Sequence, residues 1–301
     1  MTIKPIDAGP DLPAGHALDL PGRGTTFVRF SAGPAGAPTI FMLHGWTVSA
    51  DITFFPVWES LTQHFNVVSI DHRGHGRGIR NKMPFKLVDC ADDVAALCAQ
   101  SGIDSIIPFG YSMGGPIAQL LWKRHRSLVS GLVLAATTRI FASSARERRN
   151  FQVMGAMGLG ARALPTSLLH EIGGKILAKR TGRNYEEWAL AQINRNDWRM
   201  ILEAGYELGR FDSREWAHTI DVPTSVIITT QDQLVSPLRQ ANLAGDIPNA
   251  QVFEVHSAHS GIVTSSEIFV PTLLEACLSV RDRIGSQHST LVASTRRRAS
   301  S

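Results

Sequence analysis

Cysteine is scarce in this sequence, and long apolar runs are missing from it. The three cysteines are odd in number and widely spaced, and no CxxC pair indicates a zinc or redox site: Cys90, Cys98 and Cys277. No run of about 18 apolar residues is present, so no transmembrane helix is predicted. Residues 1–13 also lack the apolar stretch of a signal peptide. We therefore expect a cytoplasmic protein whose cysteines are reduced and buried.

Charge is modest as well, and its excess is confined to one end of the chain. Charged residues make up 19% of the sequence and hydrophobic residues 44%, which excludes disorder, collagen and coiled coil. The net charge of +4 equals the contribution of residues 281–298, where five arginines face one aspartate. We expect residues 284–301 to form a basic, flexible tail, and we predict no nucleic-acid partner.

Short apolar runs rich in β-branched residues alternate with longer amphipathic stretches. The runs predict strands at residues 39–43, 67–70, 106–109, 132–136, 225–230 and 252–255. The stretches between them predict helices, among them 88–100, 116–126 and 236–244. The last of these begins with Ser236 as N-cap and Pro237 at the first helical position. This alternation predicts an α/β fold, with a mostly parallel sheet flanked by helices.

The alternation stops between residues 140 and 216, where only helical patterns occur. We therefore divide the chain into core at 1–139, a helical cap at 140–216, core at 217–283 and the tail at 284–301. Two methionines of the cap, Met154 and Met157, are candidates to line an apolar substrate pocket. The alternative is that they only pack the cap onto the core.

A GxSxG motif lies between a predicted strand and a predicted helix, which is the context that this motif requires. Ser112 is its central residue, and Gly110 and Gly114 stand two residues before and two residues after it. A turn this tight strains the backbone and leaves no room for side chains at the glycines. We therefore predict that Ser112 is a nucleophile exposed above the sheet. Tyr111, which precedes it, is assigned to the substrate-binding residues.

A serine nucleophile needs a histidine base and an acid that orients it. Asp232 follows the predicted strand 225–230 and is the candidate acid, whereas the end of the preceding strand carries none. His259 follows the strand 252–255 in a loop and is the preferred base. His256 lies at the strand end and remains the alternative base. Serine, acid, histidine is one of the orders in which such a triad occurs along a chain.

A second group of residues is expected to stabilise the oxyanion that forms during attack. The backbone amide of Met113 lies at the start of the helix after Ser112. The amide of Trp46 lies in the loop after the strand 39–43, and Gly45 allows that loop to approach closely. The alternative for Trp46 is simple packing of an aromatic side chain in the core.

Together these residues resemble the α/β-hydrolase superfamily over residues 22–279. The phrases that carry the resemblance are His44-Gly45-Trp46, Asp71-His72-Arg73-Gly74-His75-Gly76, Gly110-Tyr111-Ser112-Met113-Gly114-Gly115, Asp232 before Pro237, and His259 upstream of Glu267 and Pro271. The first and third are most similar to small bacterial carboxylesterases and cofactor-free haloperoxidases or perhydrolases. In those proteins the corresponding Trp and Met amides form the oxyanion hole. The resemblance implies an eight-stranded, mostly parallel sheet with an inserted helical cap.

The resemblance also assigns a structural turn, not a catalytic role, to Asp71 and Arg73. Serine at position 112 disfavours the dehalogenases and epoxide hydrolases of the superfamily, because they use a carboxylate nucleophile. Two features differ from the common pattern: Ala258 stands where glycine often precedes the histidine, and the cap is longer than in compact esterases.

The predicted function is hydrolysis of a small-molecule carboxylic ester through an acyl-enzyme on Ser112, without a metal or organic cofactor. Thioester, lactone or carbon–carbon bond hydrolysis and perhydrolysis would use the same triad, and the sequence leaves them open. A ligand receptor with the same pocket is an alternative of another class. The sequence makes no prediction of the oligomeric state.

Overall fold

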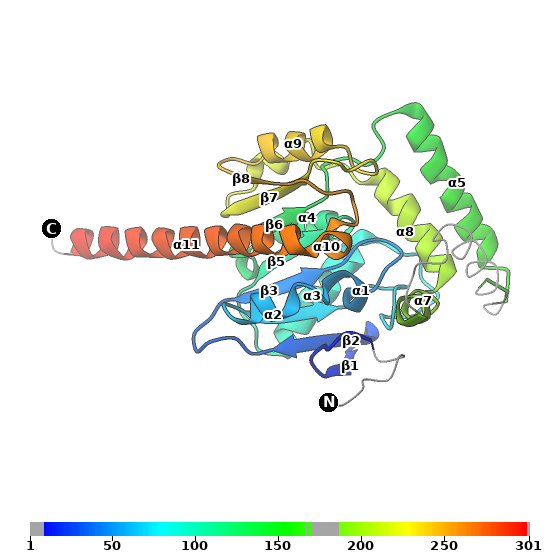
Figure 1. The fold of residues 1–301 in the computed structure, drawn as a ribbon, viewed down its shortest axis with the longest axis horizontal. Coiled ribbons are helices and arrows are strands. Elements are labelled where there is room, and N and C mark those ends of the chain that lie inside the picture. Colours follow the sequence, from blue (N-terminus) through cyan, green and yellow to red (C-terminus); the bar gives the residue numbers. More distant parts are fainter. Residues whose placement is uncertain (1–8, 166–167, 170–186, 300–301) are drawn as a thin grey trace.

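The chain forms a single eight-stranded sheet with helices on both sides (Figure 1). The computed structural model describes residues 9–165, 168–169 and 187–299. The strand order is β1-β2-β4-β3-β5-β6-β7-β8; β2 runs antiparallel to both of its neighbours, and the remaining adjacent pairs are parallel. The strands are β1 Gly15–Leu20, β2 Gly24–Ser31, β3 Thr39–Leu43, β4 Asn66–Ile70, β5 Ile107–Tyr111, β6 Leu132–Ala135, β7 Thr224–Thr229 and β8 Gln251–Val255. The predicted α/β architecture is confirmed.

Helices cover the two faces of the sheet, and the sheet separates the core into two apolar clusters. One face carries α3 (Leu87–Gln100), α4 (Gly114–Arg124) and α9 (Pro237–Asp246), and the other carries α1 (Ala50–Phe54), α2 (Trp58–Thr62), α10 (Gly261–Thr264) and α11 (Ser266–Ala299). Successive residues of β3 point to opposite faces, so Phe41 and Leu43 enter one cluster while Ile40 and Met42 enter the other. Burial on both faces explains why the parallel strands are continuously apolar.

The segment between β6 and β7 contains the α-helices α5 (Ala145–Ala161), α7 (Glu187–Ile193) and α8 (Trp198–Arg210). We call residues 140–216 the helical insertion; its residues 166–167 and 170–186 lie outside the described part of the chain. At its base Ile140 pairs antiparallel with Asp212, and the Ser213 amide donates to the Arg139 carbonyl at 2.9 Å. The chain therefore leaves the core and returns to it at neighbouring points.

The last helix extends through most of the C-terminal segment. α11 continues to Ala299 and projects beyond the sheet (Figure 1), and that residues 284–301 form a basic, flexible tail stays a prediction. Residues 284–299 contain no proline and one glycine, Gly285, to interrupt the helix. Residues 300–301 lie outside the described part. No described helix has the length and apolar character needed to cross a lipid bilayer.

Charged side chains of the core are largely paired but unevenly spread. Two of its aspartates each join two arginines: Asp93 contacts Arg23 and Arg73, and Asp51 contacts Arg29 and Arg77. Shared carboxylates thus hold the N-terminal strands to the loop after β4.

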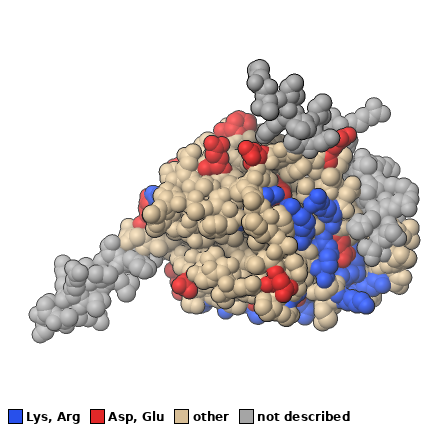
Figure 2. Space-filling view, turned by 90° about the horizontal axis from the view of Figure 1, so that it is seen from below, with Lys and Arg blue, Asp and Glu red and all other residues tan. Residues whose placement is uncertain are grey.

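Figure 2 shows Lys and Arg side chains gathered toward one side of the face seen from below, with acidic side chains scattered elsewhere on it.

Candidate active site

Ser112 stands at the sharp turn between β5 and α4, and its backbone φ is 53°. This left-handed conformation is strained for any residue with a side chain. The turn is possible because glycines flank it: a Cβ atom at Gly114 would lie 1.9 Å from the Leu43 carbonyl oxygen, and one at Gly110 would lie 2.4 Å from the Gly114 carbonyl oxygen. The backbone thus lifts the Ser112 hydroxyl above the C-terminal edge of the sheet.

Two loops at the same edge of the sheet bring an imidazole and a carboxylate to this serine. Asp232 follows β7 and His259 follows β8, as the parallel topology requires. His259 Nε2 lies 2.9 Å from Ser112 Oγ, and His259 Nδ1 lies 2.6 Å from Asp232 Oδ2. Both distances are those of hydrogen bonds. This arrangement can pass a proton from the serine hydroxyl to the imidazole while the carboxylate stabilises the imidazolium.

The carboxylate of Asp232 is buried and fully engaged. Its Oδ1 accepts from the backbone amides of Leu234 and Val235 at 2.8 and 2.9 Å, and its Oδ2 accepts from the Thr229 hydroxyl at 2.9 Å. Burial by itself would raise the pKa of Asp232, but the bond and charge of His259 and the two amides lower this pKa below its ordinary value. Asp232 is therefore an anion held in one orientation toward His259.

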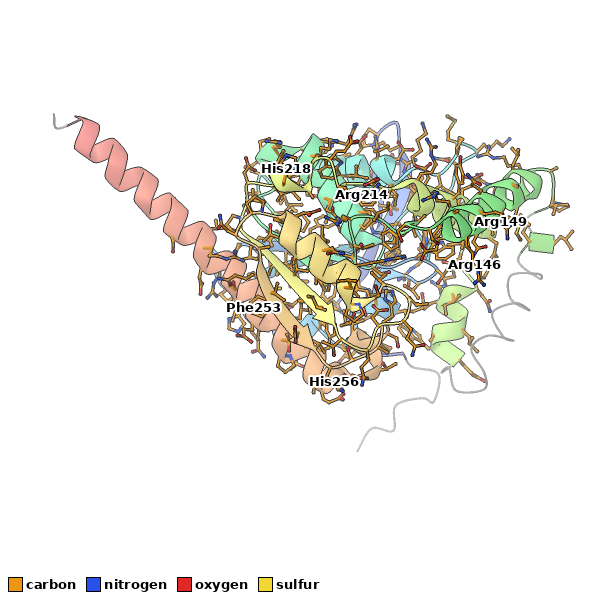
Figure 3. The ribbon with its side chains drawn as sticks, turned by 90° about the horizontal axis from the view of Figure 1, so that it is seen from above. Arg146, Arg149, Arg214, His218, Phe253 and His256 are labelled. Atoms are coloured by element: carbon orange, nitrogen blue, oxygen red, sulfur yellow. The ribbon has the colours of Figure 1, made fainter. Side chains whose placement is uncertain are left out.

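The alternative base, His256, has other contacts. Its ring lies 3.2 Å from the Thr230 hydroxyl and 2.8 Å from the Gln231 side-chain amide, and it is exposed (Figure 3). The structure brings His259 to Ser112, and not His256.

The loop after β3 approaches the serine closely, as expected for an oxyanion site. A Cβ atom added at Gly45 would lie 3.5 Å from Ser112 Cβ. Among the described residues, the backbone amides of Trp46 and Met113 have no hydrogen-bond acceptor. Both N–H groups are thus free to bind a substrate oxygen. The indole of Trp46 reaches into the helical insertion, where its N–H donates to the Ile201 carbonyl at 2.8 Å.

His44 is a residue of the site whose contacts the sequence did not reveal. Its Nε2 accepts from the His72 backbone amide at 2.9 Å, so Nδ1 carries the proton and donates to the Gly45 carbonyl at 2.7 Å. The held carbonyl belongs to the same peptide as the Trp46 N–H and therefore fixes its direction. Burial lowers the pKa of His44, which keeps the ring neutral. Its place directly before Gly45 and Trp46 was the available signal.

The turn after β4 is structural, as its position in the sequence suggested. Asp71 accepts from the backbone amides of Ala50 and Arg77 at 2.9 and 2.8 Å. Arg73 forms a two-point ion pair with Asp93. Neither side chain contacts Ser112 among the described interactions. The described residues also contain no group of three or more His, Cys, Asp or Glu arranged to hold a metal ion.

The three residues assigned to substrate binding occupy different environments. Tyr111 is 5% exposed, and its hydroxyl donates to the backbone carbonyl of His259. Met154 of α5 is half-buried, and its sulfur and the Trp46 indole both lie against Gly205 of α8. Met157 is 52% exposed on α5. Met154 therefore lies beside the indole of Trp46, and a substrate contact by each of the three stays a prediction.

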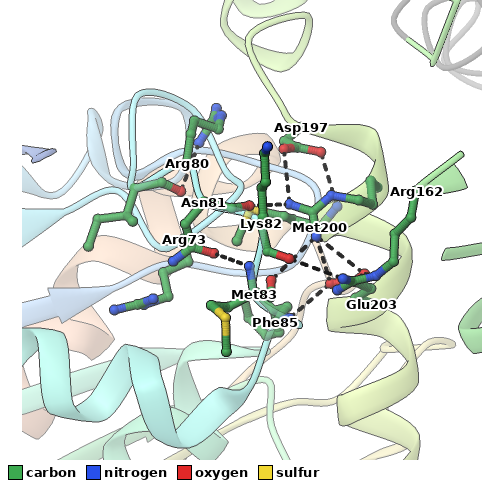
Figure 4. Close-up of polar contacts among 12 residues, drawn as sticks. Arg73, Arg80, Asn81, Lys82, Met83, Phe85, Arg162, Asp197, Met200 and Glu203 are labelled. Carbon is green, nitrogen blue, oxygen red and sulfur yellow. Dashed lines mark hydrogen bonds and ion pairs between the residues drawn. The ribbon is translucent and has the colours of Figure 1, made fainter. Parts of the chain in front are cut away.

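Polar contacts fasten α8 to the loop that follows β4 (Figure 4). Glu203 Oε2 accepts from the Phe85 backbone amide at 2.9 Å, and Glu203 also pairs with Arg162 and Arg199. Arg199 in turn donates to the Asn81 carbonyl at 2.5 Å. A buried carboxylate with several charged partners resists displacement. These contacts hold this part of the helical insertion over the loop beside the site.

Known proteins resemble this chain in sequence. Residues 38–167 match the family model described as alpha/beta hydrolase fold. A bifunctional esterase/perhydrolase from Acinetobacter calcoaceticus is 39% identical over 83 residues, a match that spans 28% of this chain and only 30% of that protein. A poly(3-hydroxyalkanoate) depolymerase from Ectopseudomonas oleovorans is 26% identical over 234 residues, which cover 76% of this chain and 81% of that protein.

Solved structures resemble it over most of its length. An esterase from Exiguobacterium antarcticum superposes with a TM-score of 0.71 at 20% identity and covers 87% of this chain and 98% of that one. An enol-lactonase from Burkholderia xenovorans superposes with a TM-score of 0.70 at 23% identity and covers 87% of this chain and 100% of that one. At these identities the likeness shows the fold alone.

Proposed function

This chain is an enzyme of the α/β-hydrolase superfamily, and on that premise we propose that it hydrolyses carboxylic esters through an acyl-enzyme formed on Ser112. The observation that carries the proposal is the continuous chain of hydrogen bonds from Ser112 Oγ through His259 to Asp232. Asp232 orients the ring so that Nε2 faces the serine. We expect the substrate to be a small ester, cleaved in the cytoplasm.

The first half of the reaction transfers the acyl group to the enzyme. Ser112 Oγ attacks the ester carbonyl carbon while His259 Nε2 takes the hydroxyl proton. The carbonyl oxygen becomes an oxyanion, which the amides of Trp46 and Met113 stabilise. The bond from carbon to the alcohol oxygen then breaks, and His259 gives its proton to the departing alcohol. The product of this half is an ester of Ser112.

The second half releases the acid. A water molecule gives a proton to His259 and attacks the acyl carbon, and the same two amides stabilise the new oxyanion. The bond to Ser112 Oγ breaks, and His259 returns the proton to the serine. The acid has then been released and Ser112 and His259 are back in their starting protonation states. No cofactor takes part in this sequence of steps.

The surroundings of the serine favour an uncharged acyl group. Trp46 and Met154 lie side by side beneath α8, and they would provide apolar surface next to the oxyanion loop. The names of the relatives, an esterase/perhydrolase and a poly(3-hydroxyalkanoate) depolymerase, support acyl-oxygen chemistry. We therefore propose esters with small to medium acyl chains as substrates.

The test is hydrolysis of p-nitrophenyl esters from acetate to laurate, with the Ser112→Ala protein as blank. We expect turnover that depends on Ser112 and that has an optimum in chain length. Labelling by a fluorophosphonate at Ser112 checks the nucleophile independently of substrate choice. A folded protein that shows neither turnover nor labelling would contradict the proposal and favour a ligand receptor.

A further inference from the structure

Tyr111 joins the strand that carries the nucleophile to the loop that carries the base. It is the last residue of β5, directly before Ser112. Its hydroxyl donates to the backbone carbonyl of His259. His259 lies in the turn that enters α10. One hydrogen bond thus ties the strand of the nucleophile to the turn of the base.

Packing holds the ring of Tyr111 in place independently of its hydroxyl. The side chain is 5% exposed, and its ring meets the ring of Phe269 from α11 edge-on at 5.8 Å between centroids. Its backbone is paired in the sheet with Ala135 of β6. A phenylalanine would satisfy all of this packing equally well. The hydroxyl is therefore the part of the side chain that packing does not explain.

A buried hydroxyl is unfavourable unless it is hydrogen-bonded, so the bond to the His259 carbonyl matters. Burial raises the pKa of Tyr111 far above its ordinary value, which keeps the phenol protonated and able to donate. A buried phenol whose hydroxyl is bonded to the backbone of the base loop fits a residue that places another group.

We propose that Tyr111 is a positioning residue that sets the distance between His259 Nε2 and Ser112 Oγ. This inference rests on the proposed serine mechanism and names a further residue for it. Because Tyr111 and Ser112 are neighbours in the chain, any shift of the β5 end moves the nucleophile and the base loop together. The 2.9 Å contact between His259 Nε2 and Ser112 Oγ is then maintained through Tyr111, the residue next to Ser112.

The experiment compares Tyr111→Phe with Tyr206→Phe, a matched loss of a tyrosine hydroxyl on α8. We expect Tyr111→Phe to lower kcat for p-nitrophenyl esters by at least about tenfold with KM changed by less than about twofold, because a misplaced base slows chemistry and not binding. The rate of fluorophosphonate labelling should fall by the same factor. Tyr206→Phe should leave both rates unchanged.

A purely structural role would lower the melting temperature of Tyr111→Phe without changing the labelling rate, and that result would overturn the inference. Wild-type labelling separates this failure from failure of the proposed function. If the wild type is labelled at Ser112 and Tyr111→Phe is labelled equally fast, only the positioning role is wrong. If the folded wild type is not labelled, both proposals are wrong.

A second variant keeps the test decisive should Tyr111→Phe fail to fold. Replacement of Tyr111 by 3-fluorotyrosine retains the ring and the hydroxyl and adds a fluorine signal next to it. We expect this signal to shift when Ser112 is labelled, because the phosphonyl group displaces His259 and the carbonyl that the phenol holds. An unchanged signal on complete labelling would contradict the inference.

Discussion

At the scale of single residues, two histidines three positions apart have different surroundings. His259 lies between Asp232 and Ser112, whereas His256 is exposed and contacts Thr230 and Gln231. We expect His259→Ala to lower kcat by about 10⁴-fold or more, because the serine loses its base. His256→Ala should change kcat by less than about threefold, as surface substitutions away from the reacting atoms do.

Steady-state kinetics on one p-nitrophenyl ester, with circular dichroism as the check of folding, measure both histidine variants. Equal losses at the two positions would contradict the assignment of the base. They would also show that the loop after β8 takes up another arrangement in solution.

The sequence supplied the candidates of the site because their signals are local. Ser112 has its glycines, and Asp232 and His259 follow strands whose apolar runs were easy to recognise. The contacts of Tyr111 and His44 could not be predicted from the sequence. Their role depends on which way a side chain points after the sheet and α10 have assembled, and no spacing in the sequence records that.

At the scale of elements, the turn between β5 and α4 depends on the absence of a side chain at Gly114. We expect Gly114→Ala to lower the free energy of unfolding by at least about 2 kcal/mol and to abolish activity, since its Cβ would collide with the Leu43 carbonyl. The matched control is Gly160→Ala in α5, where nothing lies within 4 Å of the added atom. It should raise stability by about 0.5–1 kcal/mol.

Urea unfolding followed by circular dichroism gives both free energies. The collision predicts opposite signs for the two alanine substitutions. A stable and active Gly114→Ala protein would mean that the turn can be built in another way.

Helix α5 begins with a capping box that also ties the helical insertion to the core. Glu147 accepts from the Ser144 amide at 2.9 Å and pairs with Arg239 of α9 at 2.6 Å. Burial opposes ionisation, but these partners lower the pKa of Glu147 from 4.5 to about 2. A lowered pKa means that the charged form stabilises the fold above pH 4.5, and that this contribution is lost as the pH falls toward 2.

We therefore expect Glu147→Gln to lower the melting temperature at pH 7 and the difference from wild type to shrink as the pH falls from about 4.5 toward 2. Scanning calorimetry at several pH values measures it. Glu254→Gln, on the exposed side of β8, is the control and should leave the melting temperature at pH 7 nearly unchanged. A difference that grows toward acid pH would reverse the sign and refute the role of Glu147.

The elements divide into those that the sequence located and those that it did not. The six predicted strands agree with the structure to within two residues. Five of them are central strands that are buried on both faces, and β8 at the edge of the sheet is recognised by its β-branched and aromatic residues. The hairpin of β1 and β2 was not located, since its residues are half-exposed and begin with Gly15 and Gly24. The extension of α11 to Ala299 was not located either, because basic composition favoured a tail, although no helix breaker follows Gly285.

At the scale of the whole molecule, the three cysteines are sealed inside the core. Cys90, Cys98 and Cys277 are at most 1% exposed, and burial raises the pKa of each thiol, that of Cys98 to about 12. A thiol in this state is a poor nucleophile. We expect Ellman's reagent to modify none of them in the native protein and all three after denaturation, with activity unchanged by a reductant. Rapid labelling of the native protein would contradict this packing.

The pairing of Ile140 with Asp212 has a consequence for how such a molecule can change over time. The insertion leaves the core and re-enters it at residues that pair with each other. Its two ends are therefore held together like the ends of a closed loop. Lengthening a closed loop costs only about 0.6 kcal/mol per doubling, so its size has little effect on the sheet. The part over the site can thus be exchanged for another while the nucleophile turn is inherited intact. Substrate preference and chemistry are free to evolve at different rates.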